Sequence, residues 1–110
     1  MSVDRRRGSE RREIERFKAN IEIEWEGAAR RQSGTISDIS ATGCFILCSG
    51  EVEDGDRIKI FFPLTTGSKI PLRGEVTNHV YEIGFAIRFM ELTETQKDFL
   101  EVFVDTLRED

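Results

Sequence analysis

The feature that most limits the fold of this chain is a series of six short segments between residues 19 and 90. In the first, Ile21, Ile23 and Trp25 alternate with polar residues, as in a strand with one buried face. Glycine, serine, asparagine or aspartate marks the gaps between segments. The strands are predicted at 19–26, 30–39, 44–48, 57–62, 69–77 and 82–90. Loops this short favour antiparallel pairing of neighbours.

The hydrophobic period changes after the sixth segment. Thr93 followed by Gln96 is a helix-capping pattern. Beyond it the apolar residues recur at helical spacing through residue 108, at Phe99, Leu100, Phe103, Val104 and Leu107. We therefore predict an all-β fold, a six-stranded antiparallel β-barrel with a C-terminal α-helix covering one opening and a basic N-terminal arm.

The length of 110 residues suits one domain, which we place at residues 19–110, preceded by an arm at residues 1–18 that carries little apolar sequence. Residues 10–18 could instead be partly helical. The apolar runs are too short to span a membrane, and the first residues lack the apolar core of a signal peptide. We expect a cytoplasmic protein.

The charge is distributed unevenly along the chain. Residues 1–18 hold seven basic and four acidic residues, a net charge of +3, so the net charge of −5 leaves −8 for residues 19–110. Six of the seven basic residues are arginines, whose planar guanidinium binds phosphate and guanine edges in bidentate fashion. The arm is therefore a candidate for anion binding, although it could also be a solvated segment.

Catalytic and metal-binding patterns are scarce. Cys44 and Cys48 would lie about 13 Å apart on one strand, beyond disulfide reach, so we expect reduced thiols. His79, the single histidine, is predicted to lie in a solvated turn near Asn78. With no G-x-S-x-G or H-E-x-x-H pattern and no paired metal ligands, we expect neither an enzyme nor a metal site.

A polar bend is predicted between the second and third segments, from Asp38 to Gly43. Asp38 and Ser40 occupy alternate positions, which in an extended chain point to the same side. Gly43 would let another molecule approach the backbone closely. The carboxylate can accept the N–H groups of a guanine edge, and the hydroxyl can donate or accept beside it. We interpret this stretch as the rim of a ligand site.

Arg12 and Arg16 are spaced four residues apart and could offer two guanidinium groups to one anion. The chain reads R-x-x-x-R at Arg12–Arg16 and D-x-S-x-x-G at Asp38–Gly43. In both motifs and in its predicted strands and helix it resembles the PilZ domain family of bacterial receptors for cyclic di-GMP. The spacing between the motifs makes the pair more specific than either alone.

The resemblance implies a non-enzymatic second-messenger receptor whose arm orders on binding and alters the surface shown to a protein partner. It implies that Arg12 and Arg16 hold phosphate and a guanine Hoogsteen edge, that Asp38 and Ser40 hold a guanine edge, and that Gly43 gives clearance. Because Arg11 lies just before the first motif, the resemblance also implies two stacked cyclic di-GMP molecules per chain. The glutamates between the arginines depart from the family pattern.

Two other functions remain open on the residues alone. A small barrel with a basic arm is also the design of single-stranded nucleic-acid binders, although the acidic body makes nucleic acid unlikely here. The other is a PilZ-like interaction module without a ligand. The sequence does not name the downstream protein partner.

Overall fold

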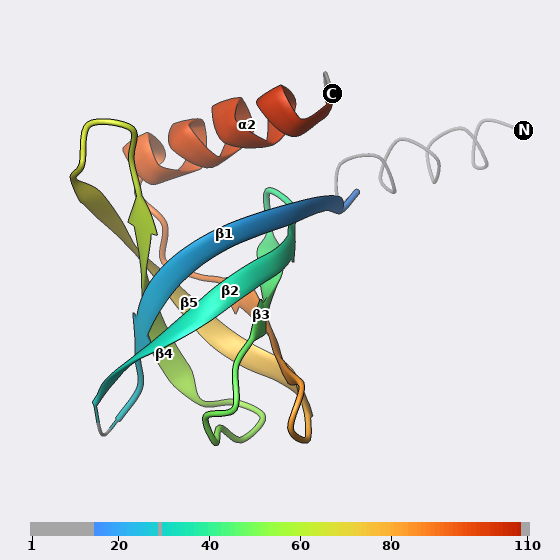
Figure 1. Ribbon diagram of the computed structural model, residues 1–110. Helices are drawn as coiled ribbons and strands as arrows, with labels where there is room; N and C mark the ends of the chain where they lie inside the picture. The colour runs from blue at the N-terminus through green and yellow to red at the C-terminus, as the bar shows by residue number, and fades with distance from the viewer. Residues whose placement is uncertain (1–14, 29, 109–110) are drawn as a thin grey trace, which may run out of the picture.

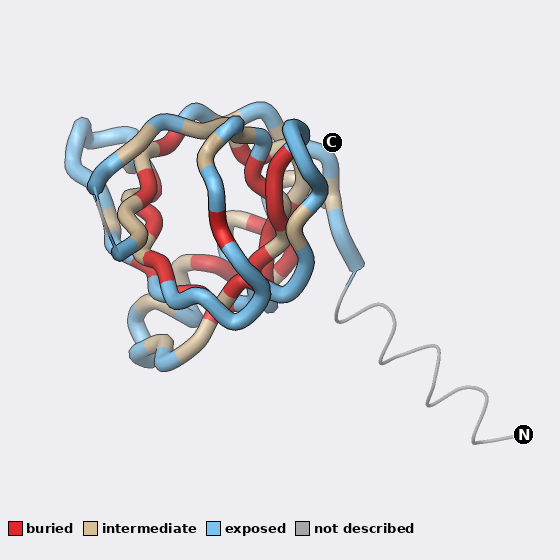
Figure 2. The backbone as a smooth tube through the Cα atoms, turned by 90° about the horizontal axis from the view of Figure 1, so that it is seen from below, coloured by how far each residue is buried: buried red, intermediate tan, exposed pale blue. Residues whose placement is uncertain are grey.

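The computed structural model describes residues 15–28 and 30–108. The elements are β1 (Phe17–Glu26), β2 (Arg31–Ile39), β3 (Gly43–Leu47), β4 (Arg57–Pro63), β5 (Lys69–Val80), β6 (Gly84–Phe89) and α2 (Glu94–Arg108). The strands form a closed barrel in the order β1-β2-β3-β6-β5-β4, with antiparallel pairing throughout and β4 pairing back to β1 (Figures 1 and 2). This confirms the predicted six-stranded antiparallel barrel with a C-terminal helix.

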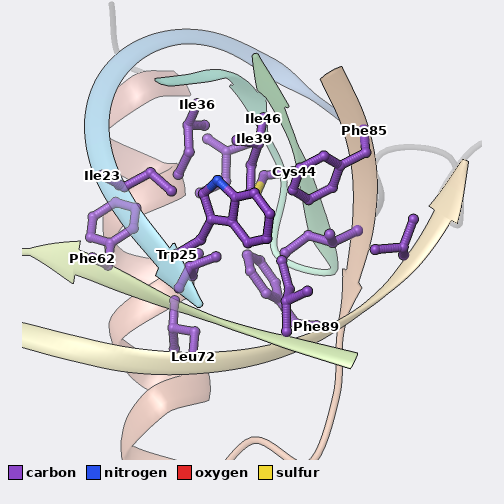
Figure 3. Packing of buried hydrophobic residues seen from close by; sticks show 14 of the residues in the cluster. Ile23, Trp25, Ile36, Ile39, Cys44, Ile46, Phe62, Leu72, Phe85 and Phe89 are labelled. Atoms are coloured by element: carbon purple, nitrogen blue, oxygen red, sulfur yellow. The ribbon is translucent and has the colours of Figure 1, made fainter. Parts of the chain in front are cut away.

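The barrel interior is filled by large apolar side chains that point inward from every strand. Trp25 lies among them, almost fully buried, and its ring meets Phe85 edge-on with 5.0 Å between centroids (Figure 3). The remaining sites of the alternating pattern face outward, since successive strand residues point to opposite faces. The outer surface of the barrel therefore carries the charged residues and any ligand site.

Helix α2 lies across one end of the barrel, the upper end in Figure 1. Leu100 and Val104 are buried, and the Phe62 ring meets Phe99 and Phe103 edge-on, with centroids 5.3 and 5.0 Å apart. The helix start is capped as predicted, because Thr93 Oγ1 accepts from the Gln96 N–H at 3.1 Å and Gln96 Oε1 accepts from the Thr93 N–H at 2.9 Å.

Two strand boundaries differ from the sequence prediction. β1 begins at Phe17, so the two residues before 19 that we assigned to the arm, or to a helix, pair with β2 instead. β5 continues to Val80, so His79 is a strand residue and not a turn residue. A β-bulge between Val76 and Asn78 allows the pairing with β6 to continue. The other strand ends agree to within two residues.

Candidate ligand-binding site

The connection between β2 and β3 is shorter than the predicted bend from Asp38 to Gly43. Asp38 lies within β2 and Gly43 begins β3, so the chain reverses over residues 40–42 alone. The backbone N–H of Ser40 donates to the carbonyl of Gly43 at 2.8 Å, and the N–H of Phe89 donates to the carbonyl of Thr42 at 2.8 Å. The turn is thus held by its own residues and by the end of β6.

Asp38 faces outward because of an irregularity in β2. Ile36 and Ile39 are both fully buried although they are three residues apart, which strict alternation would not allow. A β-bulge in the pairing with β3 lies between Ile36 and Asp38 and shifts the alternation by one residue. The Asp38 side chain is consequently 34% exposed on the outer surface.

Ser40 does not share this orientation, so the prediction that it points to the same side as Asp38 was wrong. Only 1% of Ser40 is exposed. Its Oγ accepts from the backbone N–H groups of Thr42 and Gly43 at 3.1 and 3.2 Å and lies 3.1 Å from the Thr42 hydroxyl. The chain leaves the extended conformation after Ile39, so alternation no longer applies. Ser40 shapes the turn, and its contact with a ligand stays a prediction.

Gly43 provides clearance for a neighbouring strand. A methyl group built on Gly43 would overlap the carbonyl oxygen of Ile87, and it would lie 3.3 Å from the Cα of Arg88. Gly43 and Arg88 are partners in the β3–β6 register, so the backbone of β6 occupies the space that a side chain would need. Clearance for a ligand at Gly43 remains a prediction.

Arg16 brings the two sequence motifs together. Its Nη1 lies 2.7 Å from Oδ1 of Asp38, an ion pair between residues 22 positions apart. The register explains the contact, since Phe17 pairs with Ile39 and Lys18 with Asp38, which places the chain just before β1 beside the end of β2. Arg11 and Arg12 lie outside the described residues, and Arg16, the last residue of the arginine motif, is the one seen in contact with Asp38.

Cys44 pairs with Ile39, the residue after Asp38, and is near enough to the ion pair for both charges to affect its thiol. It is fully buried, and burial raises the pKa of its thiol well above the usual range; the charges of Arg16, which lowers this pKa, and Asp38, which raises it, have smaller effects. Both cysteines are free thiols, as predicted, and Cys48 accepts from Trp25 Nε1 at 3.3 Å. Among the residues that the structure describes, no group of three His, Cys, Asp or Glu side chains could hold a metal ion.

Two outward residues near Asp38 were not singled out from the sequence. Phe45 pairs with Asp38 in the β2–β3 register and is half-buried. Arg88 pairs with Gly43, is exposed, and its Nη2 lies 3.0 Å from Oε1 of Glu75. The outer surface beside Asp38 therefore holds an aromatic ring and a second guanidinium. Their proximity to Asp38 follows only from the strand register, and Arg88 lies 50 residues from Asp38 in the chain.

The model of the family described as PilZ domain matches residues 10–105, which include both motifs and all six strands. The chain belongs to the PilZ domain family. No curated protein sequence matches it significantly. Among solved structures, it is similar to the PilZ domain of CeSA from a cellulose-synthesizing bacterium, with a TM-score of 0.70 and 19% identity over 86% of this chain and 98% of that one.

Two further solved structures share the fold. PlzA of Borreliella burgdorferi, solved in complex with c-di-GMP, aligns with a TM-score of 0.66 and 14% identity over 90% of this chain. The Bacillus subtilis inhibitor of motility, MotI/DgrA, aligns with a TM-score of 0.67 and 14% identity over 84% of this chain. The PilZ chain spans only 43% and 48% of those two proteins. No helix within its described residues is long and apolar enough to cross a membrane.

Proposed function

We propose that this PilZ domain is a non-enzymatic receptor for cyclic di-GMP. The observation that carries the proposal is the ion pair between Arg16 and Asp38 at 2.7 Å, because it joins the end of R-x-x-x-R to the start of D-x-S-x-x-G on one surface. Two motifs that were recognised separately in the sequence thus supply one cation and one anion to the same place. Cyclic di-GMP carries phosphates that need a cation and guanines whose N–H edge needs an acceptor.

On binding, Arg16 and Asp38 would each give up the other as a partner and take a group of the ligand instead. In the free domain the Asp38 carboxylate accepts from Arg16, whereas in the complex it accepts from a guanine edge and Arg16 donates to a phosphate. The ion pair is a small obstacle, since its side chains are 46% and 34% exposed and a pair this exposed contributes about 0.2–1 kcal/mol. The complex would replace this single charge-assisted bond with at least two, one from Arg16 to a phosphate and one from the guanine edge to Asp38.

The arm supplies the rest of the proposed site. We place Arg12 on a phosphate or guanine Hoogsteen edge and infer that the arm orders over the ligand, changing the surface available to a protein partner. Two stacked ligands bring four phosphates, whose repulsion requires further cations, and Arg11 supplies one. We therefore propose two cyclic di-GMP molecules per chain.

Calorimetric titration with cyclic di-GMP tests the assignment. Arg16→Ala should weaken binding by about 2–4 kcal/mol, since it removes charge-assisted bonds. The control is Arg73→Ala, an exposed arginine on β5 whose Nη1 pairs with Glu91 at 3.1 Å and which belongs to neither motif. Failure of the parent chain to bind would refute the receptor assignment and favour the alternative, an interaction module without a ligand. Equal binding by Arg16→Ala and the parent would remove Arg16 from the site.

The same titration tests the stoichiometry. The parent should bind two molecules, and Arg11→Leu should bind closer to one while keeping the first. Higher salt should weaken the second molecule more than the first, because its binding depends more on the attraction between its phosphates and arm cations such as Arg11, which salt screens. A parent stoichiometry of one would refute the role of Arg11 without affecting Arg16 and Asp38.

A further inference from the structure

The turn between β5 and β6 exposes an apolar surface that the fold does not use. Leu47 and Val80 are 43% and 37% exposed, and Tyr81 and Ile83 are 77% and 54% exposed. We call these four residues the hairpin patch. Leu47 and Val80 both pair with Gly84, from opposite sides, so their side chains leave the same outer face with only a glycine between them.

The hairpin patch is held in place by backbone hydrogen bonds. The N–H of Ile83 donates to the carbonyl of Val80 at 3.0 Å, and the N–H of Cys48 donates to the carbonyl of Ile83 at 3.1 Å. Glu82, between the two most exposed members, takes a positive φ of 62°, which closes the turn. An apolar surface fixed in this way loses little conformational entropy when a partner covers it.

The size of the patch favours a small occupant. Four partly exposed side chains of this kind offer on the order of 400 Å², the scale at which an exposed apolar patch is often functional. This is about half of the 800 Å² or so that each partner buries in a standard protein interface. A single segment of another protein, docked transiently, fits this area better than a stable dimer does.

Among the described residues at the end of the barrel that carries the hairpin patch, acidic side chains predominate, although Arg30 lines a pocket together with Glu51. Glu82 lies within the turn, and the loop that follows Cys48 carries the exposed residues Glu51, Glu53 and Asp54. This loop and the hairpin lie at the same end of the barrel, the lower end in Figure 1. A second copy of the domain, or an anionic lipid surface, would bring like charges together. A segment with lysines or arginines beside its apolar residues would be attracted.

We propose that the hairpin patch is a docking surface for a segment of a partner protein with apolar anchors flanked by basic residues. Tyr81 is the central contact, because it is the most exposed of the four and combines an apolar ring with a hydroxyl that stays solvated or bonded. The hairpin patch includes neither Arg16 nor Asp38, so the proposal does not depend on the binding of cyclic di-GMP.

The test uses two synthetic helical peptides with leucines at i, i+3, i+4 and i+7, one carrying lysine and the other glutamate at the intervening positions. Amide chemical shifts of the labelled domain are recorded during titration. The lysine peptide should shift residues 47 and 80–84, and the glutamate peptide should bind at least tenfold more weakly. Equal binding of both peptides, or shifts confined to other surfaces, would overturn the proposal.

Variants distinguish specific binding at the hairpin patch from non-specific binding of the peptide elsewhere on the domain. Tyr81→Ser combined with Ile83→Ser should weaken the lysine peptide at least tenfold, and unfolding midpoints check that the domain stays folded. Val102→Ser is the matched control, because Val102 is 65% exposed on α2. Dimerisation in sedimentation that the double variant abolishes would overturn the proposal in favour of a second copy. Binding to phosphatidylglycerol vesicles that the double variant abolishes would overturn it in favour of a membrane.

Discussion

Gly43→Ala should destabilise the domain in the absence of any ligand. The added methyl group would overlap the Ile87 carbonyl oxygen and come within 3.2 Å of the Ile87 carbonyl carbon. These are backbone atoms of the paired strand β6, so no side-chain rotation can relieve the contact. The two strands must separate at the position where Gly43 faces Arg88.

The loss in the free energy of unfolding can be estimated from the interactions that this separation of strands disturbs. Forcing an extra methyl group into packed structure costs about 1–3 kcal/mol. The hydrogen bonds from Phe89 N–H to Thr42 and from Ser40 N–H to Gly43, both 2.8 Å, lie at the same junction, and weakening one loses about 1 kcal/mol. We expect a total of about 2–4 kcal/mol, a large part of the roughly 5–15 kcal/mol that stabilises a typical domain.

Urea and thermal unfolding of the ligand-free protein measure this loss. The melting temperature should fall by on the order of 10–25 °C, since each kcal/mol corresponds to about 4–8 °C in a domain of this size. Gly67→Ala is the control: Gly67 has φ 94° but open space around it, so only backbone strain of about 1–2 kcal/mol applies. An unchanged midpoint for Gly43→Ala would refute the close-approach argument and leave Gly43 as a ligand contact alone.

Two further predictions concern Asp38 and Cys44. Asp38→Ala should narrow the difference in affinity between cyclic di-GMP and cyclic di-AMP in calorimetry, because adenine does not present N–H donors to a carboxylate in the same arrangement as guanine. Full retention of the guanine preference would mean that another residue reads the base. Burial raises the pKa of Cys44 above its usual 9.0, so at lower pH both the folded and unfolded chains keep the proton and this thiol adds no pH dependence. Above pH 9 only the unfolded chain loses that proton, and the free energy of unfolding should fall by up to about 1.4 kcal/mol per pH unit. Cys44→Ala should show a shallower decline in urea unfolding between neutral and alkaline pH, and an identical decline would contradict the assignment.

Local sequence determined the elements and the family. Alternation at Ile21, Ile23 and Trp25 specified a strand with one buried face, and Thr93 with Gln96 specified the start of α2 through reciprocal side-chain bonds that need no distant partner. The two motifs were also readable locally, since each is a short run of residues. These features depend on the nearest neighbours in the chain.

The tertiary structure decided what each motif residue does. Asp38 faces outward because a β-bulge against β3 shifts the alternation. The residue types around Asp38 do not predict that bulge. Ser40 turns inward to the turn backbone, and Gly43 is required by the carbonyl of Ile87 from a strand 44 residues away. The contact between Arg16 and Asp38 likewise follows from the register of β1 on β2. Pairing between strands fixes orientation and close approach, and pairing is set by the closed barrel as a whole, so a linear pattern cannot specify either one.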